Sequence, residues 1–199
     1  MRIISGKAGG ITLSVPKGEV RPTTDRVREA VFSILNPLMD QADVLDLFTG
    51  SGAFGLEALS RGAGNARMVD FSRLSCAAAR ANLVKTGLEG GTVIQGDAVQ
   101  FVRRELLAGR KYDIIFADPP YGLDQKTFEK IIGLVFEKEL LNPDGMMVIE
   151  HSKYTKLDHM IHFSFQKSYG GSIFSFFEIE SDNTDDSENE LDQNDSEEE

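Results

Sequence analysis

Four consecutive residues, Asp118-Pro119-Pro120-Tyr121, combine a carboxylate, two rigid residues and an aromatic ring. They follow the apolar run 112–117, which we expect to be a buried strand, so they lie at its carboxyl end, where open α/β sheets bind ligands. Proline fixes φ and lacks an amide donor, and its carbonyl remains able to accept. This group suits a flat molecule with an exocyclic amino group, which would stack on Tyr121 and donate to Asp118 and the Pro119 carbonyl. Taken alone, the motif is equally typical of an ordinary turn after a strand.

A glycine-rich segment, residues 44–55, provides a second group of candidates. It has the pattern of a strand, a tight turn and a helix start, with Gly50, Gly52 and Gly55 at the G-x-G-x-x-G spacing. These glycines allow a ligand to approach the backbone closely. Asp70 follows the next expected strand, where an acid is placed to bind ribose hydroxyls. Because nicotinamide-dinucleotide folds share this spacing, the loop alone does not identify its ligand.

Asp46, just before the loop, favours a ligand without phosphates. A carboxylate here would repel a pyrophosphate, but it could hold the ammonium group of S-adenosylmethionine directly or through water. Asp97, after the third expected strand, is placed to accept from the adenine amino group, with Phe71 and Ala98 as apolar contacts. Each acid could instead cap a helix, yet three acids at the ends of three successive strands favour a binding site. The candidate cofactor-binding residues are Asp46, Phe48, Gly50, Ser51, Gly52, Gly55, Asp70, Phe71, Asp97 and Ala98.

The elements that position these residues alternate along the chain. An amphipathic helix with apolar residues at helical spacing begins after Thr24 or Asp25, and Pro37 ends or kinks it. Strands are expected at 44–47, 66–70, 92–95, 113–117 and 146–150, and helices at 53–61, 73–85, 101–107 and about 128–136. This alternation predicts a Rossmann-like α/β fold with a mostly parallel sheet and helices on both faces.

The two ends of the chain depart from this alternation. Residues 162–167 and 172–178 predict two strands joined at Tyr169-Gly170-Gly171, a hairpin signal that makes the last strand antiparallel. They bring the expected sheet to seven strands. Residues 2–15 predict two short strands around Gly9-Gly10. We therefore expect a small N-terminal hairpin-helix extension, residues 1–40, before the main domain, residues 41–179.

The net charge of −11 comes from the end of the sequence. Residues 180–199 hold 11 of the 32 acidic residues and no basic one, which leaves 21 acidic and 21 basic residues in positions 1–179. A segment of this composition buries too little apolar surface to fold, so we expect a disordered acidic tail. The main domain is close to neutral, and the acidity of the tail does not exclude a nucleic-acid partner.

The first thirty residues are mildly basic. Arg21, Arg26 and Arg28 are candidates for contacts to RNA phosphates, although exposed arginines are as often simply solvated. The three histidines lack metal-ligand spacing, so no metal is expected, and the single cysteine, Cys76, excludes an internal disulfide. The sequence has neither a signal peptide nor an apolar run of membrane-spanning length, so we expect a cytoplasmic location.

Together these motifs resemble the bacterial 16S rRNA guanine-N2 methyltransferases, the RsmD family within the class I S-adenosylmethionine-dependent methyltransferases. The resemblance covers about residues 1–178. It is carried by residues 2–6, 21–32, 46–52, 55–62, 118–121 and 169–171. It departs from the family pattern at Thr49, where alanine is expected, and at Asp70, where glutamate is usual. The acidic tail lies outside the pattern.

The resemblance implies methyl transfer from S-adenosylmethionine to the exocyclic N2 of a guanine, guanine 966 in rRNA numbering. The substrate would be 16S rRNA or a small-subunit particle, and the catalytic residues would be Asp118, Pro119, Pro120 and Tyr121. The resemblance leaves the oligomeric state open, and we take a monomer as the default expectation. The target base must be unpaired or flipped out to reach them. A DNA adenine-N6 or cytosine-N4 methyltransferase remains an alternative, although little chain is left for a target-recognition region. A nicotinamide-dependent oxidoreductase and a non-catalytic RNA-binding protein are further alternatives.

Overall fold

A computed structural model describes residues 1–16, 23–120 and 122–179. Arg21, Tyr121 and the expected acidic tail, residues 180–199, lie outside the described residues. The helices are α1 (Asp25–Leu35), α2 (Ala53–Arg61), α3 (Arg73–Thr86), α4 (Ala98–Leu107) and α5 (Gln125–Glu137), with a short 3-10 helix η1 (Asn36–Leu38) after α1. The strands are β1 (Asp43–Leu47), β2 (Asn65–Asp70), β3 (Gly91–Gln95), β4 (Tyr112–Ala117), β5 (Leu141–Ser152), β6 (Phe163–Tyr169) and β7 (Ser172–Glu178).

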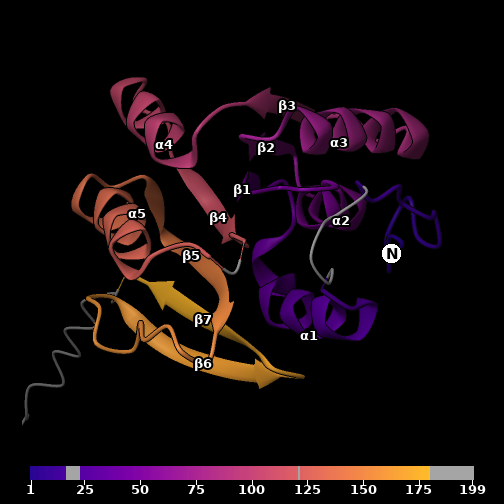
Figure 1. Ribbon diagram of the computed structural model, residues 1–199. Coiled ribbons are helices and arrows are strands. Elements are labelled where there is room, and N and C mark those ends of the chain that lie inside the picture. The colour runs from indigo at the N-terminus through magenta and orange to yellow at the C-terminus, as the bar shows by residue number, and fades with distance from the viewer. Residues whose placement is uncertain (17–22, 121, 180–199) are drawn as a thin grey trace, which may run out of the picture.

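The seven strands form one twisted sheet in the order β3-β2-β1-β4-β5-β7-β6 (Figure 1). Strands β1 to β5 run parallel to one another, and β7 pairs antiparallel with both β5 and β6. The last strand in sequence therefore lies inside the sheet, and β6 forms the edge. The predicted Rossmann-like fold, with a mostly parallel seven-stranded sheet and an antiparallel last strand, is confirmed.

Helices cover both faces of the sheet, and the alternation of side chains along each strand assigns residues to one face or the other. On β4, Ile115 packs in the core beneath α4 and α5. Its neighbour Phe116 packs in the opposite core beneath α1 and α2, with its ring 5.4 Å from that of Phe32 and 4.9 Å from that of Phe54. This two-sided burial explains why residues 114–117 of β4 are all apolar rather than alternating with polar residues.

Short polar side chains set the helix starts. Thr24, Ser72, Asp97 and Asp124 cap α1, α3, α4 and α5, each accepting from an amide in the first turn. Thr24 is thus the cap of the first helix, one of the two residues expected for that position. Helix α2 differs, because it begins after Gly52 with no side-chain cap. Asp46 of β1 takes that role from a distance in sequence, because its Oδ2 accepts from the Gly55 amide in the first turn at 3.0 Å.

The N-terminal segment forms the expected antiparallel hairpin, although its pairing is shorter than two full strands. Arg2 and Thr12 form a single antiparallel bridge, and the amides of Ile3 and Gly10 donate to the carbonyls of Ile11 and Ile3 at 2.9 Å and 2.8 Å. The segment also docks on α2: the amides of Ile4 and Ser5 donate to the buried carboxylate of Glu57, at 2.7 Å and 3.1 Å. These two amides therefore bind α2 rather than the other arm of the hairpin. Among the described residues, no helix is both long and apolar enough to cross a membrane.

Candidate active site

The glycine loop joins β1 to α2 at the carboxyl edge of the sheet. Gly50 and Gly52 have φ values of +53° and +84°, a region that favours glycine. Gly55 lies inside α2, where a Cβ would stand 2.6 Å from Cγ of Met68 on β2. The third glycine of the motif therefore allows α2 to pack closely on the sheet, whereas the first two shape the loop.

Asp46 is buried beneath this loop with only 1% of its surface exposed. Its Oδ2 accepts from the Thr49 hydroxyl at 2.5 Å and from the Gly55 amide at 3.0 Å. Burial raises the pKa of its carboxyl group to about 7, against the two hydrogen bonds, which favour the charged form. Asp46 thus ties the two ends of the loop together, a role that the sequence did not indicate.

Asp70, at the end of β2, also binds the loop. Its Oδ2 accepts from the Gly50 amide at 2.9 Å, and its Oδ1 accepts from the Ser72 amide at 2.8 Å. A carboxylate oxygen can accept more than one hydrogen bond, so both oxygens retain capacity for ribose hydroxyls. The next residue, Phe71, is 79% exposed. A large aromatic ring left in solvent beside a polar loop suits a flat ligand better than it suits the folded core.

The remaining candidates for cofactor binding take different positions. Asp97 is exposed and caps α4 through the Gln100 amide at 2.9 Å, and Ala98 behind it is buried. Phe48, at the start of the loop, has a φ of +63°, which is strained for a bulky side chain and typical of functional turns. Ser51 is buried, and its carbonyl accepts from Asn82 of α3 at 2.8 Å.

Asp118 and the two prolines follow β4, next to β1. The Asp118 amide approaches the carbonyl of Leu47, the last residue of β1, at 3.4 Å. Pro119 is buried, whereas Pro120 is exposed and its carbonyl accepts from the Leu123 amide at 2.9 Å. The structure therefore places the Asp-Pro-Pro segment beside the strand that leads into the glycine loop. Tyr121, the expected stacking residue, lies outside the described part of the chain.

A small pocket lies over this segment and includes two residues that sequence reasoning missed. It is lined by Asp118, Pro119, Pro120, Leu123, Phe128, Glu150, His151, Ser152 and Thr155. His151 donates from Nδ1 to the Ser152 carbonyl at 2.9 Å, so its Nε2 accepts from the Ser175 hydroxyl at 2.8 Å. Burial lowers the pKa of this histidine. Glu150 and His151 lie near the carboxyl end of β5, and that position was the available signal.

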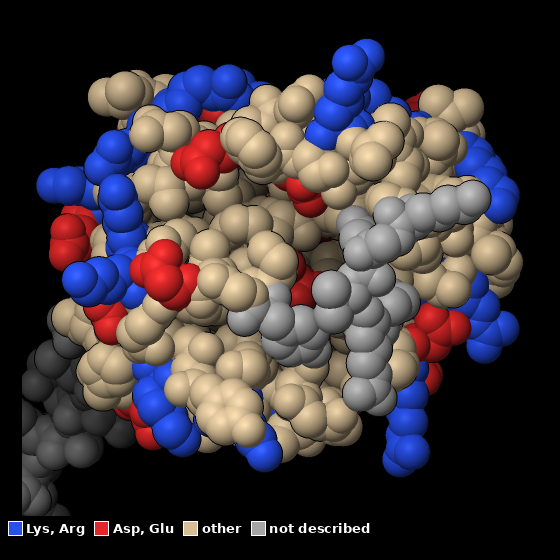
Figure 2. Space-filling view, viewed as in Figure 1, with Lys and Arg blue, Asp and Glu red and all other residues tan. Residues whose placement is uncertain are grey.

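The three arginines expected to contact RNA differ in accessibility. Arg26 is exposed, and Arg21 lies outside the described residues. Arg28 is fully buried: its Nη2 donates to the Arg2 carbonyl at 2.6 Å and to Asp25 at 2.8 Å, and burial lowers its pKa. Its guanidinium is not accessible to a phosphate, so the phosphate contact predicted for Arg28 was wrong. In the view of Figure 2, Lys and Arg of the described residues lie mainly around the periphery, whereas acidic side chains lie both among them and beside the hollowed centre.

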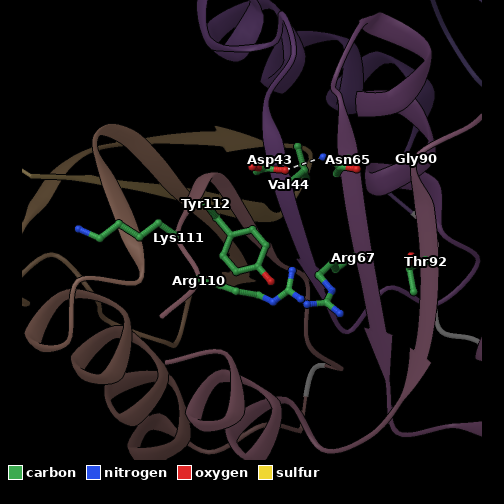
Figure 3. A pocket seen from close by; sticks show the side chains of 9 residues that line it. All are labelled: Asp43, Val44, Asn65, Arg67, Gly90, Thr92, Arg110, Lys111 and Tyr112. Carbon is green, nitrogen blue, oxygen red and sulfur yellow. Dashed lines mark hydrogen bonds between the residues drawn. The ribbon is translucent and has the colours of Figure 1, made fainter. Parts of the chain in front are cut away.

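A cavity of about 400 Å³ lies at the opposite, amino edge of the sheet (Figure 3). Buried Glu105 of α4 accepts there from Arg67 at 2.6 Å and from the Tyr112 hydroxyl at 2.7 Å, and Arg110 approaches within 3.3 Å. The carboxylate neutralises much of this positive charge, so the cluster fastens α4 to β2 and β4. None of the candidate catalytic or cofactor-binding residues lines this cavity. We therefore do not assign it as the active site.

The described residues contain no group of three or more His, Cys, Asp or Glu side chains that could hold a metal ion. The candidates that the structure brings together are instead those of the carboxyl edge. Asp46 and Asp70 converge on the glycine loop, and Asp118 follows the neighbouring strand β4. This edge offers a shaped loop, an exposed ring and an acid beside two prolines, which suits a nucleoside-like cofactor and a second flat molecule.

Comparison with known proteins identifies the family. The family described as Conserved hypothetical protein 95 matches residues 1–178. The Escherichia coli K12 ribosomal RNA small subunit methyltransferase D is 36% identical over 151 residues, which cover 75% of this chain and 74% of that protein.

The chain belongs to the RsmD family of class I S-adenosylmethionine-dependent methyltransferases. YlbH of Bacillus subtilis is 34% identical over 163 residues, covering 81% of this chain and 88% of YlbH. A solved structure from Thermus thermophilus superposes with a TM-score of 0.80 at 30% identity, covering 90% of this chain and 99% of that one. The family predicted from the motifs is confirmed.

Proposed function

We propose that this chain transfers the methyl group of S-adenosylmethionine to the exocyclic N2 of a guanine in 16S rRNA. The observation that carries the proposal is the position of Asp118-Pro119-Pro120 after β4, beside the strand that leads into the glycine loop. A carboxylate is thereby placed next to the expected cofactor site. The small-subunit rRNA methyltransferase of E. coli, to which this chain is similar, supports rRNA as the substrate class. The sequence resemblance adds guanine 966 as the expected target.

The residues of the carboxyl edge fit S-adenosylmethionine, which supplies an electrophilic methyl group on a positively charged sulfur. The second lone pairs of Asp70 would accept from the ribose hydroxyls, and Phe71 would pack on the adenine. Asp97 would take the adenine amino group in addition to capping α4. Asp46 would act on the cofactor through the loop, because its Oδ2 already holds Thr49 and Gly55. The absence of phosphate from this ligand agrees with an edge rich in carboxylates.

Asp118 would activate the amino group of the target base. The lone pair of an aromatic amine is delocalised into the ring, which makes it a poor nucleophile. Hydrogen bonds to Asp118 and the Pro119 carbonyl would turn that lone pair toward the methyl group. As the N–C bond forms and the C–S bond breaks, positive charge moves to the nitrogen. The carboxylate would stabilise that charge and take the proton, and Tyr121 would hold the ring in line.

The RNA would reach this edge as an unpaired or flipped nucleotide, since a base inside a duplex cannot enter such a pocket. Arg26 is exposed and near the start of α1, so we assign it, with Arg21, to phosphate contacts. Residues 1–40 would then form the RNA-contacting part of a monomer that acts in the cytoplasm, where ribosomes are modified.

Methyl transfer from labelled S-adenosylmethionine tests the proposal. The acceptors would be 16S rRNA, small-subunit particles and duplex DNA, each followed by digestion to nucleosides. We expect label in N2-methylguanosine from rRNA or particles. Label in methyladenine or methylcytosine from DNA would instead favour the alternative DNA methyltransferase, which uses the same kind of pocket. Absence of label from every acceptor would contradict both activities.

An Asp118→Ala variant tests the assigned mechanism. We expect it to lower the transfer rate by about 10²–10³-fold or more, the usual cost of removing a group that stabilises developing charge. Its affinity for S-adenosylhomocysteine should be unchanged, as measured by the ligand-induced rise in melting temperature. Asp124→Asn is the matched control, because Asp124 caps α5 nearby and asparagine is an equally good cap. An active Asp118→Ala enzyme would contradict the mechanism.

A further inference from the structure

Glu150 lies beside Asp118 on the same face of the sheet. Ala117 and Ile149 are register partners on the parallel strands β4 and β5, so Asp118 and Glu150 are the next residues along the two chains. Neighbours in register on parallel strands project to the same face, and adjacent strands lie about 4.8 Å apart. Both residues line the small pocket at the carboxyl edge. The pocket therefore has two neighbouring acids, of which the mechanism uses one.

Glu150 is 7% exposed, yet within the described residues it makes no ion pair. From the part of the chain that the structure describes, one hydrogen bond reaches it: the Thr23 hydroxyl donates to Oε2 at 2.5 Å. A carboxylate has about four acceptor sites, and burying one without a cation or further donors is costly. The remaining acceptor sites of this carboxylate can take hydrogen bonds from a ligand. Glu150 thus has acceptor capacity beside the reacting position.

The hydrogen-bonding edge of guanine carries donors that could fill the acceptor sites of Glu150 and Asp118. Next to its exocyclic amino group, guanine carries a ring N1–H, so two adjacent nitrogens donate. In adenine and cytosine the ring nitrogen beside the amino group is an acceptor, which a carboxylate would repel. Enzymes that flip bases read them through this Watson–Crick edge. Two neighbouring carboxylates are therefore complementary to guanine and to neither of the other amino-bearing bases.

We propose that Glu150 selects guanine by accepting a hydrogen bond from N1–H, while Asp118 binds the N2 amino group. The inference rests on the proposed function and extends it to the choice of base. Thr23 is the positioning residue: its hydroxyl holds Oε2 and so connects the segment before α1 to the base-binding pocket. The same segment that leads into the arginine-bearing helix then orients the residue that recognises the base.

The test uses RNA in which the mapped target guanosine is replaced by 2-aminopurine riboside. This base retains the 2-amino group but has an acceptor at N1. The wild-type enzyme should prefer guanine by about 10²-fold or more in kcat/KM, because a site built to accept from a donor rejects an analogue that lacks it. In Glu150→Gln the amide can donate to N1 of 2-aminopurine, so the preference should fall by about tenfold or more.

Thr23→Val is the matched control, because it removes the bond to Glu150 but leaves the carboxylate. We expect it to lower kcat/KM on both bases to a similar extent, with the preference for guanine retained. If Glu150 only tethers the N-terminal segment, Glu150→Gln will behave in the same way, and that result would overturn the proposal. Equal rates on both bases with the wild-type enzyme would also overturn it.

Folding of the variants is checked by their melting temperatures. If Glu150→Gln is too unstable to assay, Glu150→Met fills a similar volume without accepting or donating, and the guanine preference should again fall. A preference unchanged in Glu150→Met would refute the assignment. Failure of the proposed function itself is recognised separately, since the wild-type enzyme would then label no guanine in any RNA.

Discussion

Replacing Asp46 by asparagine should flatten the pH dependence of folding stability. The carboxylate is 1% exposed, and burial raises its pKa to about 7. Its two hydrogen bonds, from Thr49 and Gly55, both end on Oδ2, so the single carbonyl oxygen of asparagine can accept both. The substitution therefore removes the charge while retaining the contacts that close the glycine loop.

Proton linkage gives the sign and the size of the change in the free energy of unfolding with pH. In the unfolded chain the carboxyl group has its ordinary pKa of 3.8, so between pH 4 and 7 the folded state binds more protons and stability falls as pH rises. With a folded pKa of about 7, the free energy of unfolding of the wild type should fall by about 2–3 kcal/mol between pH 5 and pH 8, relative to Asp46→Asn.

Urea denaturation of both proteins without cofactor, at half-unit steps from pH 5 to 8, measures this difference. Asp97→Asn serves as the control for an exposed aspartate, since asparagine caps a helix equally well. Curves for the wild type and Asp46→Asn that stay parallel over the whole range would refute the reasoning. They would mean that the charge of Asp46 is no less stable in the folded protein than in the unfolded one.

Two further outcomes are expected. In thermal or urea unfolding, Gly55→Ala should lower the free energy of unfolding by about 1–3 kcal/mol, because its Cβ would stand 2.6 Å from Met68. Gly133→Ala on α5 is the control: its Cβ would have no neighbour nearer than 3.6 Å, so the same measurement should show no change or a gain of up to about 1 kcal/mol. Phe71→Ala should weaken S-adenosylhomocysteine binding about tenfold in calorimetry with little change in melting temperature, since the ring is exposed; unchanged affinity would contradict a contact with adenine.

Most of the fold could be predicted because its central strands are buried and because the residues that begin helices and form turns lie next to those elements in the sequence. The run ending at Ala117 is apolar on both faces, and Thr24, Ser72 and Asp97 cap helices within three residues of themselves. The hairpin of residues 163–178 carried its own glycine turn. In residues 2–15 the hairpin was predictable from Gly9-Gly10, but its short extent was not, because the amides of Ile4 and Ser5 bind Glu57, more than fifty positions away.

The site was predictable in its location but less so in its contacts. Strand ends and glycine spacing identified Asp70 and Asp118, since parallel strands end at one edge. That Asp46 faces the loop, that Arg28 is fully buried and that Glu150 lies beside Asp118 depend on packing between distant segments. A charged residue on an amphipathic helix is normally expected to be exposed. Arg28 is buried instead because its guanidinium binds the Arg2 carbonyl and Asp25, which the helix pattern does not reveal.

The inner position of β7 has a consequence for biosynthesis. Residues 172–178 leave the ribosome after every other strand, yet they pair with β5 and bury Phe174, Phe176 and Phe177. Until then the hydrogen-bonding edge of β5, which carries Glu150 and His151 near its end, stays open to other chains. A nascent or truncated polypeptide lacking these residues would expose β5 as an aggregation-prone edge strand and would leave the pocket of Asp118 and Glu150 incomplete. Activity and escape from aggregation would thus be acquired in the same late step of synthesis.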